Sequence, residues 1–423
     1  MERGFNNLND IQGDYFFAKG DCLEDYTIIS IKLKNNLYLK ESLGESRYDK
    51  FLLYYCKELE KLLTEEEQIA LSNNQILNVI IKKENVSSFL KFKDLIVIPF
   101  NGDKEICYFD IVTRSGIYNI EKTDSITTAL EKAKMALEAA ENDKVDSMIF
   151  TEELKEKFVQ EQRILSIFPS ALKNSEFTVY YQPKIYLKDN KLCGSEALVR
   201  WKRNNEIIFP NEFVPVLEKE NMIWKLDFYI LEQVCKDIRK WLDAGLNPVK
   251  TSINFSKTNL SDPCFSDKVL SILKKYDIDS QFIEVELTET TDAMDYTNMI
   301  KLVETMKKNN INVSIDDFGT GYSSLNLVKC LAANTIKIDK TFVDNIQNKK
   351  DAVVIMCMIS IALQLGIDII AEGAETKEQV EILYSMGCDK IQGYYFDRPL
   401  PKEEYETRLI NKNYEKKFKL AKN

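Results

Sequence analysis

An α/β fold is predicted for residues 173–412, and an α+β domain is predicted for residues 1–155. The first observation is the length of 423 residues, which exceeds one ordinary domain of about 100–200 residues and predicts two domains. The second is that apolar or β-branched runs alternate with helix-like segments from residue 176 onward, which is typical of repeated βα units. There are eight such runs, which favours a closed, TIM-like (β/α)8 barrel.

The strands and helices of the barrel follow from the spacing of its apolar residues. Strands are expected at Phe177–Gln182, Gly194–Trp201, Thr251–Ser256, Phe282–Glu289, Asn312–Asp317, Thr335–Asp339, Asp368–Glu372 and Lys390–Phe396. Between them, apolar residues recur at every third and fourth position, which predicts helices at Ile223–Leu242, Ser266–Lys275, Tyr296–Lys308, Ala352–Leu365 and Lys377–Met386.

The connection between the first two strands breaks the βα pattern. Only Ile185–Leu192 separates them, whereas a parallel crossover needs a dozen or more residues. The sequence therefore predicts an antiparallel first strand, paired in a hairpin with Asp189-Asn190 near its turn.

Residues 1–155 show a different, mixed pattern. Strands are expected at Tyr26–Leu33, Ile76–Lys82 and Cys107–Val112, and helices at Lys50–Leu63 and Ile126–Ala140. The charged stretch Thr151–Arg163 carries no Gly or Pro, so we expect a linker helix that extends to about residue 172.

Composition excludes several classes of function. The 57 basic and 67 acidic residues give a net charge of −10, which argues against a duplex nucleic acid partner. The nine cysteines include no C-x-x-C pair and indicate a reduced, cytoplasmic protein. The longest apolar run, Val353–Leu365, is shorter than the ~20 residues of a membrane span. Histidine is absent, so hydrolysis would depend on carboxylates, Lys and hard metals.

Polar residues stand at the ends of nearly all the predicted barrel strands, where barrels place their reactive groups. A single carboxylate there is commonly solvated or caps a helix. Several converging carboxylates repel one another unless a divalent cation coordinates them, and all-oxygen ligation suits Mg²⁺, Mn²⁺ or Ca²⁺. Two adjacent aspartates could serve two ions. The set is Gln182, Glu196, Arg200, Asn254, Glu286, Glu289, Asp316, Asp317, Lys337, Glu372 and Gln392.

These segments resemble the EAL-domain family of cyclic di-GMP phosphodiesterases over about 240 residues. The matching words are Tyr181-Gln182-Pro183, EALVRW at 196–201, SINFS at 252–256, ELTE at 286–289, DDFGTGYSSL at 316–325, Lys337-Ile338-Asp339, EGAE at 372–375 and QGYY at 392–395. The resemblance implies a barrel with an antiparallel opening strand and hydrolysis of cyclic di-GMP to linear pGpG. It also implies two Mg²⁺ or Mn²⁺ ions and a homodimer. Ca²⁺ is expected to inhibit, because its looser and longer coordination should misplace the attacking water.

The resemblance also implies a role for each matching residue. Metal ligands would be Glu196, Asn254, Glu286 and Asp316 for one ion and Asp317 for the other. Lys337 would orient the attacking water and Glu372 would act as its base. Gln182 and Arg200 would contact the dinucleotide, Gln392 would assist the metal and water network, and Glu289 would support the 317–325 loop.

One departure lies three residues before the lysine. The family often has Pro-x-Asp there, whereas this chain has Ala332-Ala333-Asn334, and the lost charge could weaken loop coupling or dimer contacts. Every residue needed for the metals and the water is nevertheless present.

The N-terminal domain resembles a degenerate GGDEF domain more faintly, through YTIIS at 26–30, RSGIY at 114–118 and the helix before Phe150. The signature loop reads Ser72-Asn73-Asn74-Gln75-Ile76, without the paired glycines and acidic residues, and Lys32 and Lys34 stand where the first strand should offer an aspartate. We therefore expect a regulatory or dimerisation domain without cyclase activity.

Two other functions remain open from the sequence. Enolase-type barrels also place acidic Mg²⁺ ligands and a lysine base at strand ends, but their lysine removes a proton from carbon. A catalytically silent receptor would bind cyclic di-GMP without cleaving it and signal through the N-terminal domain.

Overall fold

The computed structural model describes residues 23–72, 75–94, 96–101, 106–288, 293–319 and 333–414. The chain divides into two compact units, Met1–Arg163 and Ile164–Asn423, and each is described by itself. The boundary falls inside helix α5, Glu152–Lys173.

The second unit is a closed TIM-like barrel, which confirms the predicted fold class. Parallel pairings join each of its neighbouring strands from β9 to β16, and β8 closes the barrel between β16 and β9. The eight barrel strands are β8 Phe177–Tyr186, β9 Lys191–Arg203, β11 Lys250–Phe255, β12 Ile283–Thr288, β13 Asn312–Phe318, β14 Thr335–Ile338, β15 Asp368–Glu372 and β16 Lys390–Gln392. Two short strands, β10 Glu206–Ile208 and β17 Leu400–Pro401, extend the sheet.

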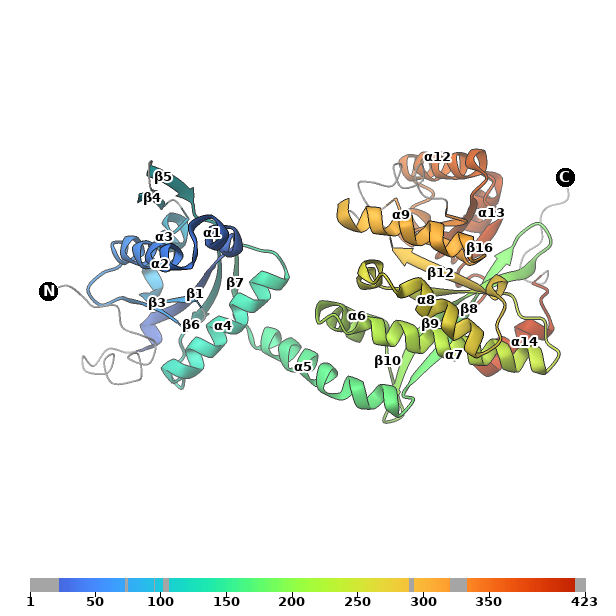
Figure 1. Cartoon of the computed structure of the whole chain (residues 1–423), viewed down its shortest axis with the longest axis horizontal. Helices are drawn as coiled ribbons and strands as arrows, with labels where there is room; N and C mark the ends of the chain where they lie inside the picture. The colour runs from blue at the N-terminus through green and yellow to red at the C-terminus, as the bar shows by residue number, and fades with distance from the viewer. Residues whose placement is uncertain are drawn as a thin grey trace. The chain divides into compact units, whose positions relative to one another are not determined.

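The helices lie outside these strands (Figure 1). They bury their apolar faces against the outer surface of the barrel, as the predicted spacing required, in one continuous core. Their bounds are α6 Pro210–Lys219, α7 Ile223–Asp243, α8 Phe265–Lys275, α9 Ala293–Lys308, α11 Lys340–Asp344, α12 Lys349–Leu365, α13 Lys377–Ser385 and α14 Lys402–Ile410.

The first strand is antiparallel, as the short connection predicted. β8 pairs with β9 from Phe177↔Trp201 to Tyr186↔Lys191, and it also pairs antiparallel with β16. Asn190 at the turn has a φ of 54°, a left-handed conformation that Asn tolerates better than other side chains. The strand continues four residues beyond the predicted end at Gln182, and this places Lys184 in the barrel interior.

The first unit is an α+β layer built on a sheet with the order β2-β3-β1-β6-β7. The strands are β1 Tyr26–Leu33, β2 Gln68–Leu71, β3 Leu77–Lys82, β6 Thr113–Asn119 and β7 Ser147–Ile149. One face packs on α1 Asn36–Leu43, α2 Glu45–Glu60 and α3 Val86–Phe92, and the other on α4 Ile126–Asn142. The remaining strands, β4 Val97–Asn101 and β5 Ile106–Asp110, form a separate two-stranded sheet.

The predicted strand Cys107–Val112 is present as β5, although it pairs with β4 and not with the five-stranded sheet. The segment that pairs with β1 is β6, which follows it and contains Gly116. A glycine normally weakens a strand, but here a Cβ would collide with the backbone of Ala133 and Leu137 in α4. Gly116 therefore lets α4 approach the sheet closely.

Within the described residues, none of the helices has the length and apolar character needed to cross a membrane.

Candidate metal centre at the mouth of the barrel

Strand alternation directs the predicted site residues into the barrel. Side chains two residues apart on a strand share a face, and the register aligns the inward positions of neighbouring strands. Glu286 lies opposite Asn254, Gln182 lies opposite Glu196, and Glu372 lies opposite Gln392. Eight sequence-predicted residues meet here: Gln182, Glu196, Asn254, Glu286, Asp316, Lys337, Glu372 and Gln392.

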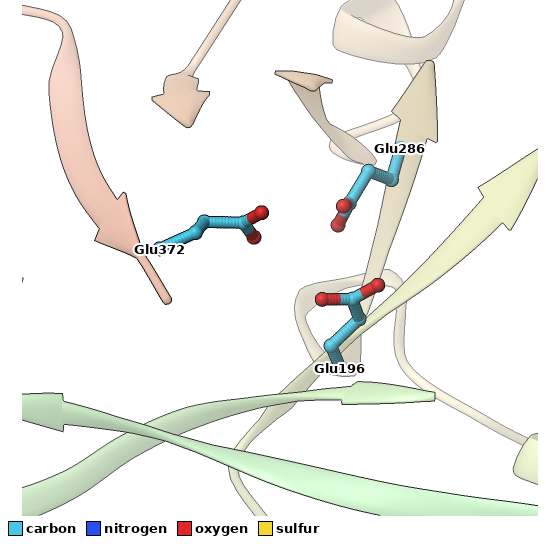
Figure 2. Close-up of side chains that lie close together, drawn as sticks. All are labelled: Glu196, Glu286 and Glu372. Carbon is cyan, nitrogen blue, oxygen red and sulfur yellow. The ribbon is translucent and has the colours of Figure 1, made fainter. Parts of the chain in front are cut away.

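Three of these residues form a compact carboxylate cluster. Glu196, Glu286 and Glu372 each offer an oxygen, and the three oxygens lie within 4.8 Å of one another. Figure 2 shows the three carboxylates arriving from different strands and pointing toward a common space. Such a set of hard oxygen donors matches the ligand preference of Mg²⁺ or Mn²⁺.

Lys337 lies at the centre of the cluster and is fully buried. Its Nζ lies 3.2 Å from Glu196 Oε2, 3.2 Å from Asp316 Oδ1 and 2.6 Å from Glu372 Oε1. It also contacts Glu286 Oε1. One ammonium group thus faces four carboxylates, so the cluster holds an excess of negative charge.

Two amide side chains orient Glu196. Asn254 Nδ2 donates to Glu196 Oε1 at 2.7 Å, and Gln392 Nε2 donates to Glu196 Oε2 at 2.6 Å. Gln392 Nε2 also lies 3.1 Å from Gln182 Oε1. The Asn254 carbonyl oxygen therefore stays available while its amide nitrogen fixes the carboxylate.

Asp316 and Asp317 are adjacent, and an irregularity in β13 separates their directions. The register with β14 shifts between Ile315 and Phe318, and Asp317 has a φ of 53°. The Asp317 amide donates to Asp316 Oδ1 at 2.9 Å. The Asp317 carboxylate lies beside Asp339, whose charge adds to burial in raising the pKa of Asp317.

The electrostatics divide the carboxylates into two kinds. Burial alone would raise the pKa of Glu196, but the charges of Lys337 and Lys184 outweigh it and lower that pKa to about 2. Burial, followed by the charge of Glu372, raises the pKa of Asp316 well above its usual range. Burial also raises the pKa of Glu372, against the opposing charge of Lys337. The charges of Lys337 and Lys184 thus keep the pKa of Glu196 low but do not offset burial at Asp316 and Glu372.

Unsatisfied oxygen atoms support a metal at this position. Glu286 is fully buried, and its Oε2 accepts no hydrogen bond from the described residues; neither does Oε1 of Gln392. A buried acceptor without a donor is costly unless a cation or water completes it. The residues present therefore fit a divalent cation.

The remaining predicted residues lie elsewhere. Arg200 is farther along β9, where its guanidinium lies 5.5 Å from the ring centroids of Tyr180 and Phe209. Glu289 lies outside the described residues, as does most of the 317–325 loop. Beside Asn254, a largely apolar cavity of about 260 Å³ opens between β9, α6 and α7, with Asp227 in its wall.

The sequence reading missed a second polar layer inside the barrel. Lys184 and Glu284 are both buried; Lys184 follows Gln182 by two residues on the antiparallel β8, and Glu284 precedes Glu286 by two residues on β12. Strand alternation could have identified both residues in the sequence, because Lys184 shares a strand face with Gln182 and Glu284 shares one with Glu286.

Comparisons with known proteins agree with this geometry. The family model described as "EAL domain" matches residues 166–399. The "Signaling protein YkoW" of Bacillus subtilis (strain 168) is 29% identical over 385 residues, which are 88% of this chain and 47% of that protein. The "Cyclic di-GMP phosphodiesterase NbdA" of Pseudomonas aeruginosa is 31% identical over 62% of this chain and 34% of its own. The chain thus spans less than half the length of these relatives.

A solved structure entitled "PaMucR Phosphodiesterase, c-di-GMP complex" is 31% identical, with a TM-score of 0.55, and covers 57% of this chain and 99% of its own. The match of the family model over more than half of the sequence, on a barrel of this form, decides the assignment. This chain belongs to the EAL-domain family.

Proposed function

We propose that this protein hydrolyses cyclic di-GMP to linear pGpG with two Mg²⁺ or Mn²⁺ ions. The observation that carries the proposal is the convergence of four carboxylates, two buried and two partly buried, on Lys337 at the mouth of an EAL-family barrel. Relatives named cyclic di-GMP phosphodiesterases, and a related phosphodiesterase solved with c-di-GMP, support the choice of substrate.

The residues would divide the chemistry among them. Glu196, Asn254, Glu286 and Asp316 would hold one ion, and Asp317 would contribute to the second. Bound divalent cations supply charge that stabilises the attacking and leaving oxygens of a phosphodiester. Lys337 would orient the attacking water through its ammonium group, and Glu372 would accept the proton of that water.

Substrate recognition would use the residues around this cluster. Gln182 and Gln392 lie beside Glu196, and the Arg200 guanidinium can form a charge-assisted contact with a phosphate. The cavity beside Asn254 has apolar walls suited to a flat base, and Asp227 in its wall provides a polar atom.

The experiment is an assay of the full chain with cyclic di-GMP and Mg²⁺ or Mn²⁺, with separation of pGpG. We expect cleavage by the wild type and none by Glu196→Ala. We also expect Ca²⁺ to inhibit, because its longer and looser coordination misplaces the water. Binding without cleavage in either metal would instead identify a silent receptor, and turnover of a carboxylate substrate would indicate enolase-type chemistry.

We further propose that the first unit is a degenerate GGDEF-like regulatory domain without cyclase activity. The support is its α+β layer and the alignment with YkoW, which at 385 residues must extend into this unit. The test is incubation of the Glu196→Ala full chain with GTP, since this variant should preserve any cyclic di-GMP made. Detectable synthesis would contradict the proposal.

A cytoplasmic homodimer completes the proposal. Helix α12 exposes Val353, Val354, Met356, Leu363 and Leu365, each at least 40% accessible, and such a face suits a second copy of the chain. Light scattering should report a dimer, and Val353→Lys combined with Leu363→Lys should give a monomer.

A further inference from the structure

Beneath the carboxylate cluster, the barrel interior contains a second buried cation, Lys184. Its side chain is 4% exposed, and Nζ donates to Ser252 Oγ at 2.8 Å. The same Nζ lies 3.5 Å from Glu284 Oε1 and 3.8 Å from Glu286 Oε2. Lys184 therefore lies between Glu284 of the lower layer and Glu286 of the carboxylate cluster.

These contacts belong to a column of alternating charge inside the barrel. Lys250, a third exposed, lies 3.7 Å from Glu284, and Lys184 follows Glu284 in the column. Glu286 comes next and contacts Lys184 with one oxygen and Lys337 with the other. The column thus runs from a partly exposed lysine to the mouth.

Within the part of the chain that the structure describes, Glu286 is held by a hydrogen bond at only one of its two carboxylate oxygens. Lys337 contacts Oε1, but Oε2 accepts no hydrogen bond from the described residues. Glu196, by contrast, is fixed at both oxygens by amide donors. The charge of Lys184 is thus positioned to hold the Glu286 carboxylate in one rotation.

We propose that Lys184 is a positioning residue for the metal centre, which holds Glu286 in the orientation that binds the cation. This inference rests on the proposed metal-dependent function. Residues that orient metal ligands from behind typically change metal affinity by about 10–100-fold when they are replaced. A lysine charge near the site would also repel the incoming cation. Replacing Lys184 should therefore lower metal affinity if Lys184 positions Glu286, and raise it if Lys184 only repels the cation.

The test is Mn²⁺ binding by calorimetry to metal-depleted full-length protein, with the wild type compared to Lys184→Met. Methionine keeps an unbranched side chain of similar length without the charge. We expect Mn²⁺ affinity to fall roughly 10–100-fold. Lys250→Met is the control, because the ion pair that the structure describes for Lys250 is with Glu284 and not with Glu286. The Mn²⁺ affinity of this variant should remain within about twofold of wild type.

A double variant separates positioning from a purely structural role. In Lys184→Met, Glu284 loses a buried partner, so stability should also fall. Lys184→Met combined with Glu284→Gln removes both charges, and we expect it to recover stability in urea unfolding without recovering Mn²⁺ affinity. Recovery of both would show that Lys184 only neutralises Glu284.

Other outcomes overturn the inference without touching the proposed function. Unchanged or tighter Mn²⁺ binding by both Lys184 variants would refute positioning, even if the wild type produced pGpG. If the wild type bound Mn²⁺ but made no pGpG, the proposed hydrolysis would fail, and the affinity comparison would still decide the role of Lys184. A wild type that bound no Mn²⁺ would refute both.

Discussion

Replacing Lys337 with methionine tests the charge balance of the candidate metal centre without an activity assay. Among the residues that the structure describes, Lys337 is the one cation that contacts Glu196, Glu286, Asp316 and Glu372 together. Breaking a buried ion pair from one side costs about 3–5 kcal/mol. For a barrel of this size, that loss corresponds to a melting temperature lower by roughly 6–20 °C at about 2–4 °C per kcal/mol.

The assay is differential scanning calorimetry at pH 8, first with a chelator and then with Mn²⁺. Mn²⁺ supplies the missing charge to the same carboxylates, and at 1,000 times its Kd it returns about 4 kcal/mol. We therefore expect the melting temperature of Lys337→Met to fall strongly in chelator, and Mn²⁺ to restore most of that loss. At lower pH the loss should shrink, because Asp316 and Glu372, whose pKa values burial raises, protonate first.

Lys340→Met is the matched control. Lys340 is 47% exposed and pairs with Glu375 at 2.5 Å, so its removal should cost at most about 1 kcal/mol. The reasoning is refuted if Lys337→Met melts like this control in chelator, or if Mn²⁺ leaves its lost stability unrecovered.

Three further predictions concern catalysis, pH and packing. Glu372→Gln should keep cyclic di-GMP binding while turnover falls by roughly 10²–10⁴, and joint loss of metal and substrate affinity with turnover per complex unchanged would make Glu372 a ligand instead of the base. Burial raises the pKa of Asp227 from 3.8 to about 7, against hydrogen bonds from the Ser256 amide and Asn259. Between these values the folded state keeps a proton that the unfolded chain loses, so stability falls as pH rises through this window, by up to roughly 4 kcal/mol. Asp227→Asn should remove this fall, and parallel stability–pH curves for variant and wild type would contradict it. Gly116→Ala should destabilise the first unit by about 1–3 kcal/mol in urea, since its Cβ has no room beside Ala133 and Leu137, and an unchanged midpoint would show that α4 can move away.

The barrel could be predicted from sequence because its information is local. Each strand is a short apolar run that ends in a polar residue, and parallel strands bring those ends to one mouth. This reasoning located Glu196, Asn254 and Glu286 before their distances were known. The short Ile185–Leu192 connection likewise fixed the direction of β8, since too few residues were available for a crossover.

The rest depended on contacts between distant segments. The predicted first strand ended at Gln182, so Lys184 was assigned to no strand and its place under Glu286 was missed. No strand was predicted at Thr113–Asn119, and only the close approach of α4 explains a glycine inside that strand. The hydrogen bonds from Asn254 and Gln392 to Glu196 also depend on three-dimensional packing. So do the pKa values of the clustered carboxylates.

The irregularity at Asp317 has a consequence for how the site can evolve. A regular strand presents only alternate residues to one side, so a second ligand from the same strand would stand about 7 Å from the first. The register of β13 shifts between Ile315 and Phe318, so the consecutive residues Asp316 and Asp317 can both direct their carboxylates toward the same region. The left-handed backbone at Asp317 costs of order 1 kcal/mol, and glycine would relieve it at the loss of the carboxylate. If Asp317 serves the second ion as proposed, selection for stability and selection for that ligand act in opposite directions at this position.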